Sequence, residues 1–244
     1  MKKTTLTLLC AAALLQACSK TDAPAAPAAP APSLTDATSI PAAKQAVEAK
    51  QVAQAPKADK NTPIESYQEL NSGKTLMFIY LAMSNMPVDY EKISTILSND
   101  YRSQNDEFKK RDILTALKPG IDAEMVKAKA TRYFYMDVKA SVDKYDFTTK
   151  SFAITDMGDA TSYRYFFDAA DYKLTFSNGD AFSKLPVADE LQARNIESLR
   201  SQYQTMKVRL YFFAATTKLG ETIVIGELTK ARLLDAKDKV LAEL

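Results

Sequence analysis

The chain has 244 residues, no histidine and 2 cysteines, with 32 Lys and Arg against 30 Asp and Glu. The lack of histidine excludes Ser-His-Asp triads, Cys-His dyads and most zinc hydrolase sites, because each of them needs an imidazole. The balanced charge argues against nucleic acid as a partner, since nucleic-acid-binding proteins usually carry a basic surface.

The N-terminus combines a basic start, a short apolar run and a small residue before a cysteine. Residues 1–3 carry two lysines, and residues 4–15 are mostly Leu and Ala. The apolar run is too short to cross a bilayer, which takes about 20 residues, but it suits the core of a signal peptide. With Leu15, Ala17 and Cys18, this segment resembles the signal class of bacterial lipoproteins.

The resemblance implies cleavage after Ala17, so that residues 1–17 are a signal peptide and Cys18 is the site of lipid attachment. A diacylglyceryl group on the Cys18 sulfur, with a further acyl chain on its amine, gives stable anchoring, because each buried methylene contributes about 0.8 kcal/mol. Ser19 after the cysteine implies the outer membrane, with the domain facing the periplasm. The mature chain then has no free thiol and is formally neutral, since two lysines leave with the signal. The alternative is an ordinary secretory signal with an incidental cysteine.

Residues 18–62 are predicted to be the lipidated cysteine followed by a flexible tether. Ala and Pro dominate residues 23–32, and no aromatic residue precedes Tyr67. Such a composition buries too little apolar surface to offset the entropy lost on ordering, and Ala/Pro repeats favour extended polyproline II. Residues 41–55 contain enough good helix formers for a solvent-exposed helix. Residues 63–244 are predicted to form a single globular domain.

The first part of this domain is predicted to be helical. A dense apolar run at residues 76–83 predicts a buried helix that ends before Pro87. Lys118-Pro119-Gly120 predicts a helix stop, because proline inside a helix removes a hydrogen bond and clashes with the preceding turn. The expected helix starts are Pro63 (followed by Ile64, Tyr67 and Leu70 at helical spacing), residue 76, Asp89, Asn105 or Asp106, and Asp122.

After residue 130 the sequence becomes rich in β-branched and aromatic residues, which favour strands. Asn178-Gly179 is typical of a hairpin turn. Strands are predicted at residues 131–138, 152–155, 162–167, 172–177, 207–215 and 222–234, followed by a turn at 235–239 and a final edge strand, with one helix containing Leu191, Ile196 and Leu199. Helices followed by strands, with one inserted helix, predict an α+β fold with a mostly antiparallel sheet.

Two short motifs resemble catalytic or nucleotide-binding sequences. Ser141-Val-Asp-Lys144 fits the Ser-x-x-Lys pattern of penicillin-interacting enzymes, but it lies between predicted strands and lacks the companion motifs. Ser72-Gly-Lys-Thr75 resembles the end of a phosphate-binding loop, but Gln68 stands where the first glycine is needed. We interpret the first as a chance match and the second as a break between helices.

Five aspartates on predicted loops raise the question of calcium, which takes six to eight oxygen ligands. Their spacing fits no standard calcium loop, and solvated turns are the usual place for such residues. They are Asp156, Asp159, Asp168, Asp171 and Asp180. We therefore assign no metal site, no cofactor and no catalytic residue.

Aromatic residues are concentrated between Tyr133 and Phe182, notably in Tyr163-Arg-Tyr-Phe-Phe167. Adjacent residues of a strand point to opposite faces, so part of this set is available to line a groove for a peptide or glycan. Packing within the core is the commoner use of aromatic residues in strands.

These observations favour a lipid-anchored bacterial envelope protein with a non-catalytic periplasmic binding or accessory domain. The expected partners are membrane lipid, through acylated Cys18, and an envelope protein that contacts a sheet edge or an aromatic surface. One alternative is a carboxylate-dependent, glycan-cleaving enzyme, which needs two acidic side chains about 5–10 Å apart across a cleft. Another is a purely structural envelope lipoprotein.

Overall fold

The computed structural model describes residues 40–84, 86–155, 157, 162–218 and 220–244. The predicted signal peptide, Ala17, Cys18 and the first part of the tether lie outside the described residues, as do Asp156 and Asp159. Residues Ile40–Leu244 form one compact unit.

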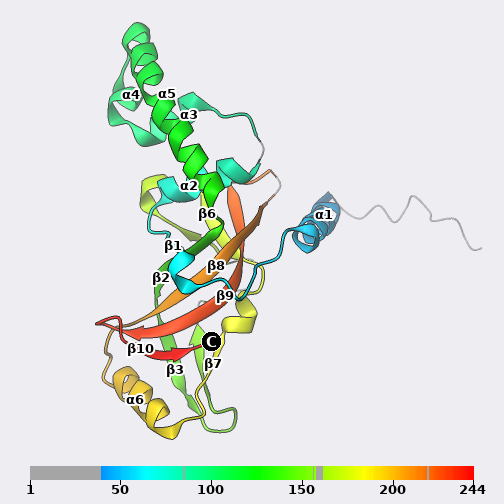
Figure 1. The fold of residues 1–244 in the computed structure, drawn as a ribbon, viewed down its shortest axis with the longest axis vertical. Coiled ribbons are helices and arrows are strands. Elements are labelled where there is room, and N and C mark those ends of the chain that lie inside the picture. Colours follow the sequence, from blue (N-terminus) through cyan, green and yellow to red (C-terminus); the bar gives the residue numbers. More distant parts are fainter. Residues whose placement is uncertain (1–39, 85, 156, 158–161, 219) are drawn as a thin grey trace, which may run out of the picture. The chain divides into compact units, whose positions relative to one another are not determined.

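Helices lie mainly in the first half of this unit and strands mainly in the second (Figure 1). The α-helices are α1 (Ile40–Gln54), α2 (Gly73–Ser84), α3 (Tyr90–Leu97), α4 (Asn99–Ser103), α5 (Glu107–Ala130) and α6 (Glu190–Ser201). Short 3-10 helices are η1 (Ile64–Ser66), η2 (Phe167–Ala169) and η3 (Gly179–Phe182). The strands are β1 (Gln68–Glu69), β2 (Tyr133–Lys139), β3 (Ser141–Asp146), β4 (Ser151–Thr155), β5 (Arg164–Tyr165), β6 (Lys173–Phe176), β7 (Lys184–Pro186), β8 (Met206–Thr217), β9 (Ile223–Asp235) and β10 (Val240–Glu243). The predicted α+β class is confirmed, with α6 as the helix inserted among the strands.

The strands form two sheets. The larger sheet has the order β1-β2-β8-β9-β6-β5, with β10 also paired to β9, and the smaller has the order β3-β4-β7. Most pairs are antiparallel, but β1 pairs with β2, and β6 with β9, in parallel. The two longest strands, β8 and β9, therefore form the centre of the larger sheet, although they come late in the chain.

The hydrophobic core lies between helix α2 and one face of the larger sheet. Helix α2 contacts β6, β8 and β9, and its residues 76–80 are buried. On the sheet, alternate side chains such as Phe134, Leu210 and Phe212 face the same cluster. Full burial of one such side chain contributes about 1.5–3 kcal/mol. The dense apolar run of the sequence is thus explained by a helix that is covered on most sides.

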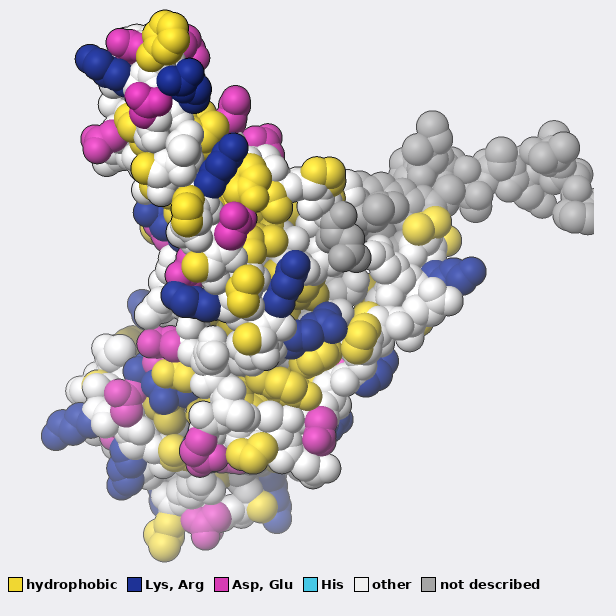
Figure 2. Space-filling view, turned by 45° about the horizontal axis from the view of Figure 1, so that its top comes forward, with side chains coloured by type: hydrophobic (Ala, Val, Ile, Leu, Met, Phe, Trp, Pro, Cys, Tyr) yellow, Lys and Arg dark blue, Asp and Glu magenta, His cyan; other side chains and the backbone are white. Residues whose placement is uncertain are grey.

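Helices α3, α4 and α5 form an arm that extends from the sheet (Figure 1). Side-chain caps start each helix: Asp89 accepts from the Lys92 N–H, Ser98 from the Tyr101 N–H, and Asp106 from the Phe108 N–H. Acidic and basic side chains are interspersed along the arm in the view of Figure 2. The predicted starts at Asp89 and Asp106 are confirmed, whereas α4 was not predicted.

The predicted stop at Pro119 is wrong, because α5 continues through Pro119 and Gly120 to Ala130. A proline inside a helix costs about 3 kcal/mol relative to alanine. Beyond it, Ile121 and Met125 are buried in the core cluster, and each buried apolar side chain contributes about 1.5–3 kcal/mol. Tertiary packing of the last turns outweighs the local penalty.

Two further local predictions are wrong for similar reasons. The helix expected from Pro63 is a single 3-10 turn, after which Tyr67 leads into β1. Asn178-Gly179 does not close a hairpin, since β6 pairs in parallel with β9. Instead the Asn178 side-chain amide donates to the Leu228 carbonyl and accepts from the Leu228 N–H, at 2.9 and 2.8 Å. In both places contacts with distant strands decide the local conformation.

The segment before β1 runs over the outer face of the larger sheet, opposite α2. The Tyr67 ring makes edge-on contacts with the rings of Tyr133 and Tyr211, each with centroids 5.3 Å apart. Upstream, the Ala58 N–H donates to Glu227 and the Asp59 N–H to the Tyr133 hydroxyl. Residues 58 and 59, which belong to the predicted tether, thus lie against the domain.

Candidate functional site

An edge of the larger sheet carries three exposed aromatic side chains, Tyr163, Tyr165 and Phe167, which we name the aromatic edge. Their exposed fractions are 40%, 52% and 93%. They alternate along β5 and into η2 with Phe166, which is half-buried against the core. The alternation expected of a strand therefore directs every second residue of 163–167 to solvent, and all three of these positions are aromatic.

Two of the three rings of this edge contact each other, and the third contacts a lysine. The rings of Tyr165 and Phe167 are T-shaped with centroids 5.8 Å apart. The Lys173 ammonium lies 5.5 Å from the centroid of the Tyr163 ring, and Lys173 is directly opposite Tyr165 in the β5–β6 pair. The three rings and Lys173 form one surface rather than isolated exposed residues.

Asp168 fixes the backbone of this edge to the N-terminus of α2. Its carboxylate accepts hydrogen bonds from the Ser72 hydroxyl at 2.7 Å, the Gly73 N–H at 2.8 Å and the Lys74 N–H at 3.2 Å. Burial opposes its ionisation, but these hydrogen bonds outweigh that effect and lower the pKa of Asp168. The carboxylate also complements the positive end of the helix dipole. Phe167 is therefore presented by an anchored segment.

The same contact explains the Ser72-Gly-Lys-Thr75 motif. A Cβ atom on Gly73 would lie 2.9 Å from the Ala169 nitrogen, closer than real side chains come. The glycine thus allows α2 to approach η2, and Asp168 occupies the backbone N–H groups that a phosphate would need. The motif serves as a docking point for η2.

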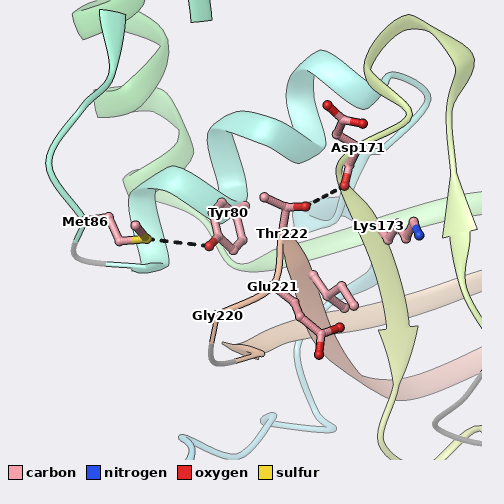
Figure 3. A pocket seen from close by; sticks show the side chains of 8 residues that line it. Tyr80, Met86, Asp171, Lys173, Gly220, Glu221 and Thr222 are labelled. Atoms are coloured by element: carbon pink, nitrogen blue, oxygen red, sulfur yellow. Dashed lines mark hydrogen bonds between the residues drawn. The ribbon is translucent and has the colours of Figure 1, made fainter. Parts of the chain in front are cut away.

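A cleft lies beside the aromatic edge, between the end of α2 and the starts of β6 and β9 (Figure 3). Its volume is about 430 Å³. The Tyr80 hydroxyl donates to the Met86 sulfur at 3.7 Å, and the Thr222 hydroxyl donates to the Asp171 carbonyl at 2.6 Å. Lys173 lines this cleft and also contacts Tyr163, so the cleft and the aromatic edge are continuous.

Two carboxylates line the cleft, so their geometry is relevant to the alternative of a carboxylate-dependent, glycan-cleaving enzyme. The side chains of Asp171 and Glu221 point in opposite directions in Figure 3. Glu221 forms an ion pair with Lys218 at 3.2 Å. An acid and a base facing each other across a substrate, as glycan cleavage requires, are not formed by these two residues.

A second groove of about 430 Å³ lies between α6 and the turn after β3. Phe147 is exposed there, and its ring is T-shaped to Tyr145 with centroids 5.1 Å apart. Glu197 accepts from the Tyr145 N–H at 3.4 Å, so α6 covers the free edge of β3. Hydrogen bonds from Arg200 lower the pKa of Glu197. Covering an edge strand in this way prevents further strand pairing.

The other motifs do not assemble into a site. Ser141 and Lys144 lie on strand β3, not at a helix start as the Ser-x-x-Lys chemistry requires. Asp180 belongs to η3, whereas Asp168 caps α2. Within the described ranges, no group of three or more His, Cys, Asp or Glu side chains is arranged to hold a metal ion.

Nothing in the sequence singles out Lys173, because a single lysine next to a buried strand carries no pattern. The aromatic content of residues 163–167 is evident from the sequence, but the exposure of Tyr163, Tyr165 and Phe167 depends on the position of β5 at the sheet edge.

No protein-family model matches the chain, and comparison with curated proteins and with solved structures also gives no match. None of the helices in the described part of the chain is both long and apolar enough to span a membrane. The geometry of the aromatic edge and the N-terminal sequence are therefore the features that bear on function.

Proposed function

We propose that this protein is a lipid-anchored bacterial envelope protein whose periplasmic domain binds a protein partner without catalysing a reaction. The proposal rests on the aromatic edge, where Tyr163, Tyr165 and Phe167 are exposed on a fixed segment. Aromatic residues commonly supply most of the binding energy at protein interfaces, with tyrosine among the commonest.

Anchoring makes this edge better suited to binding than a mobile aromatic side chain. The hydrogen bonds of Asp168 hold the backbone next to Phe167 in the free protein. A partner then has less conformational freedom to remove on binding, which improves affinity. Burial of one phenylalanine side chain contributes about 1.5–3 kcal/mol. Lone exposed apolar residues need no explanation, but a contiguous group is typical of an interaction site.

The anchor is a separate part of the proposal and is supported by the sequence alone. Cleavage after Ala17 and acylation of Cys18 attach the chain to the outer membrane, with residues 18–62 as the tether. Replacement Cys18→Ala is expected to release the protein from membranes and to abolish palmitate labelling. Continued labelling of the variant would refute the anchor without affecting the aromatic edge.

Crosslinking in living cells tests the binding surface. A photoreactive amino acid placed at Lys173 is expected to trap a protein neighbour that mass spectrometry identifies. The double replacement of Tyr165 and Phe167 by serine is expected to abolish that crosslink. Replacement Phe108→Ser is the matched control, because Phe108 is 72% exposed but lies on the arm.

Equal crosslinking in the edge variant and the control would contradict the proposal, and so would recovery of lipid without any protein neighbour. Thermal unfolding of both variants verifies that they remain folded.

A further inference from the structure

A small polar cavity lies where helix α5 ends and strand β2 begins, next to the end of β8. Its volume is about 220 Å³. Lys129, Arg132 and Thr216 supply its polar side chains. The remaining lining residues are small or apolar: Ala82, Met83, Ala128 and Ala215.

Arg132 is the central group of this cavity. Its Nε donates to the Ala214 carbonyl at 2.8 Å and one terminal nitrogen donates to the Ala215 carbonyl. The guanidinium also lies 4.7 Å from the centroid of the Phe213 ring. These contacts fix its orientation at the β8 bulge between Ala214 and Thr216. A guanidinium has five N–H donors, so three remain for a ligand.

Among the described residues, the two cations of the cavity have no carboxylate partner. None of the ion pairs formed by the described residues includes Lys129 or Arg132. Burial lowers the pKa of Arg132, because a charged guanidinium is less well solvated there than in water. The C-terminal end of α5 offsets about half an elementary charge. Two positive charges therefore exceed what the helix end neutralises.

Thr216 adds a hydroxyl donor. Its Oγ1 accepts from the Gln51 side chain at 3.5 Å, so its own O–H is available to the cavity. An ammonium, a fixed guanidinium and a hydroxyl thus line one pocket that is open to solvent. A planar carboxylate is satisfied by the guanidinium alone, whereas a tetrahedral oxyanion has oxygens for all three groups.

We propose that this cavity binds a phosphate group. The ligand is either free phosphate or the phosphate of a lipid headgroup, and the chemistry of recognition is the same for both. This site is independent of the aromatic edge, and binding to it does not depend on the proposed protein partner.

Titration calorimetry on the chain from residue 18 onward, carrying Cys18→Ala, tests the site, because this protein lacks both the acyl chains and the apolar run at residues 4–15. Inorganic phosphate and vesicles of phosphatidylglycerol are titrated separately. Heat with phosphate alone identifies free phosphate as the source. Vesicle binding that phosphate displaces identifies the headgroup. Absence of binding in both titrations at millimolar phosphate overturns the proposal.

Variants distinguish this cavity from general attraction of anions. Replacement Lys129→Ala is expected to weaken binding about tenfold, since a hydrogen bond to a charged group is lost. Arg132→Lys keeps the charge but removes the fork, and is expected to weaken binding by a similar factor. Lys109→Ala, on the same helix but far from the cavity in sequence, is the control and should bind as the parent does. Equal losses for Lys109→Ala and Lys129→Ala would refute the site. Lys129 is exposed, so its variant is expected to fold.

Discussion

The arm and the aromatic edge both expose aromatic side chains, but they hold them in different ways. Phe108 sits in the first turn of α5, and Arg111 lies 5.5 Å from its ring centroid on the same helix. Phe167 precedes Asp168, which is bonded to residues nearly a hundred positions earlier in the chain. Exposure alone therefore does not define a site. Clustering and long-range anchoring separate the edge from the arm.

The largest expected difference between the two regions comes from one glycine at each: Gly73 of α2, which packs against η2 of the edge, and Gly120 of the arm. Gly73→Ala is expected to lower the free energy of unfolding by about 1–3 kcal/mol, because the new Cβ overlaps the η2 backbone. Gly120→Ala is expected to raise it by up to about 1 kcal/mol, because nothing lies within 4 Å and alanine favours helix. Urea unfolding of both variants measures the two effects. Equal changes would mean that η2 does not press against α2.

Removal of the helix caps is expected to give a smaller difference between the two regions. Asp168→Ala and Asp106→Ala each remove a cap, at a cost of about 1 kcal/mol. Only Asp168→Ala is expected to loosen the edge, detected as faster amide hydrogen exchange in residues 163–170. Exchange that speeds up equally in the arm would contradict the comparison.

The lowered pKa of Asp168 also predicts a pH effect. The folded state binds this proton less readily than the unfolded state does, so the contribution is complete above the unfolded pKa of about 3.9 and is lost as pH falls through the folded value. The parent should therefore lose more stability than Asp168→Asn on acidification below about pH 4. Parallel curves of stability against pH for the two proteins would show that folding does not lower the pKa of Asp168.

The smallest expected effect concerns the exposed rings themselves. Phe167→Ser and Phe108→Ser are both expected to change the free energy of unfolding by less than about 0.5 kcal/mol, since surface substitutions rarely do more. Thermal unfolding checks this. A large loss for Phe167→Ser alone would assign that ring a structural role and remove it from the binding surface.

Local sequence patterns predicted those elements whose causes are local. Asp89 caps α3, and the apolar run at residues 76–83 lies in α2. Both are predictable because the signal for each lies within a few neighbouring residues of the sequence. The helix stop predicted at Pro119 is wrong, because the burial of Ile121 and Met125 depends on contacts between α5 and α2, which is distant in sequence. The hairpin predicted at Asn178-Gly179 is wrong, because the Asn178 side chain bonds to Leu228, which is 50 residues further along the chain.

The candidate site shows the same division. The aromatic content of residues 163–167 was visible in the sequence, whereas their exposure followed from the place of β5 in the sheet. No local pattern links Asp168 to Gly73, or Arg132 to the carbonyls of β8. Contacts between residues so far apart require the fold itself.

The order of strands in the larger sheet has a consequence for how this protein is made. Strands β8 and β9 join the two halves of that sheet, yet both lie in the last forty residues of the described chain. A nascent chain that ends before Met206 contains the smaller β3-β4-β7 sheet and the pairs β1-β2 and β5-β6, but it lacks the two strands that join β2 to β6 in the larger sheet. The larger sheet is therefore completed only when synthesis is nearly finished, and pairing of strands so far apart in the sequence is intrinsically slow. In the envelope function proposed above, such a delay would suit export through a channel that accepts only unfolded chains.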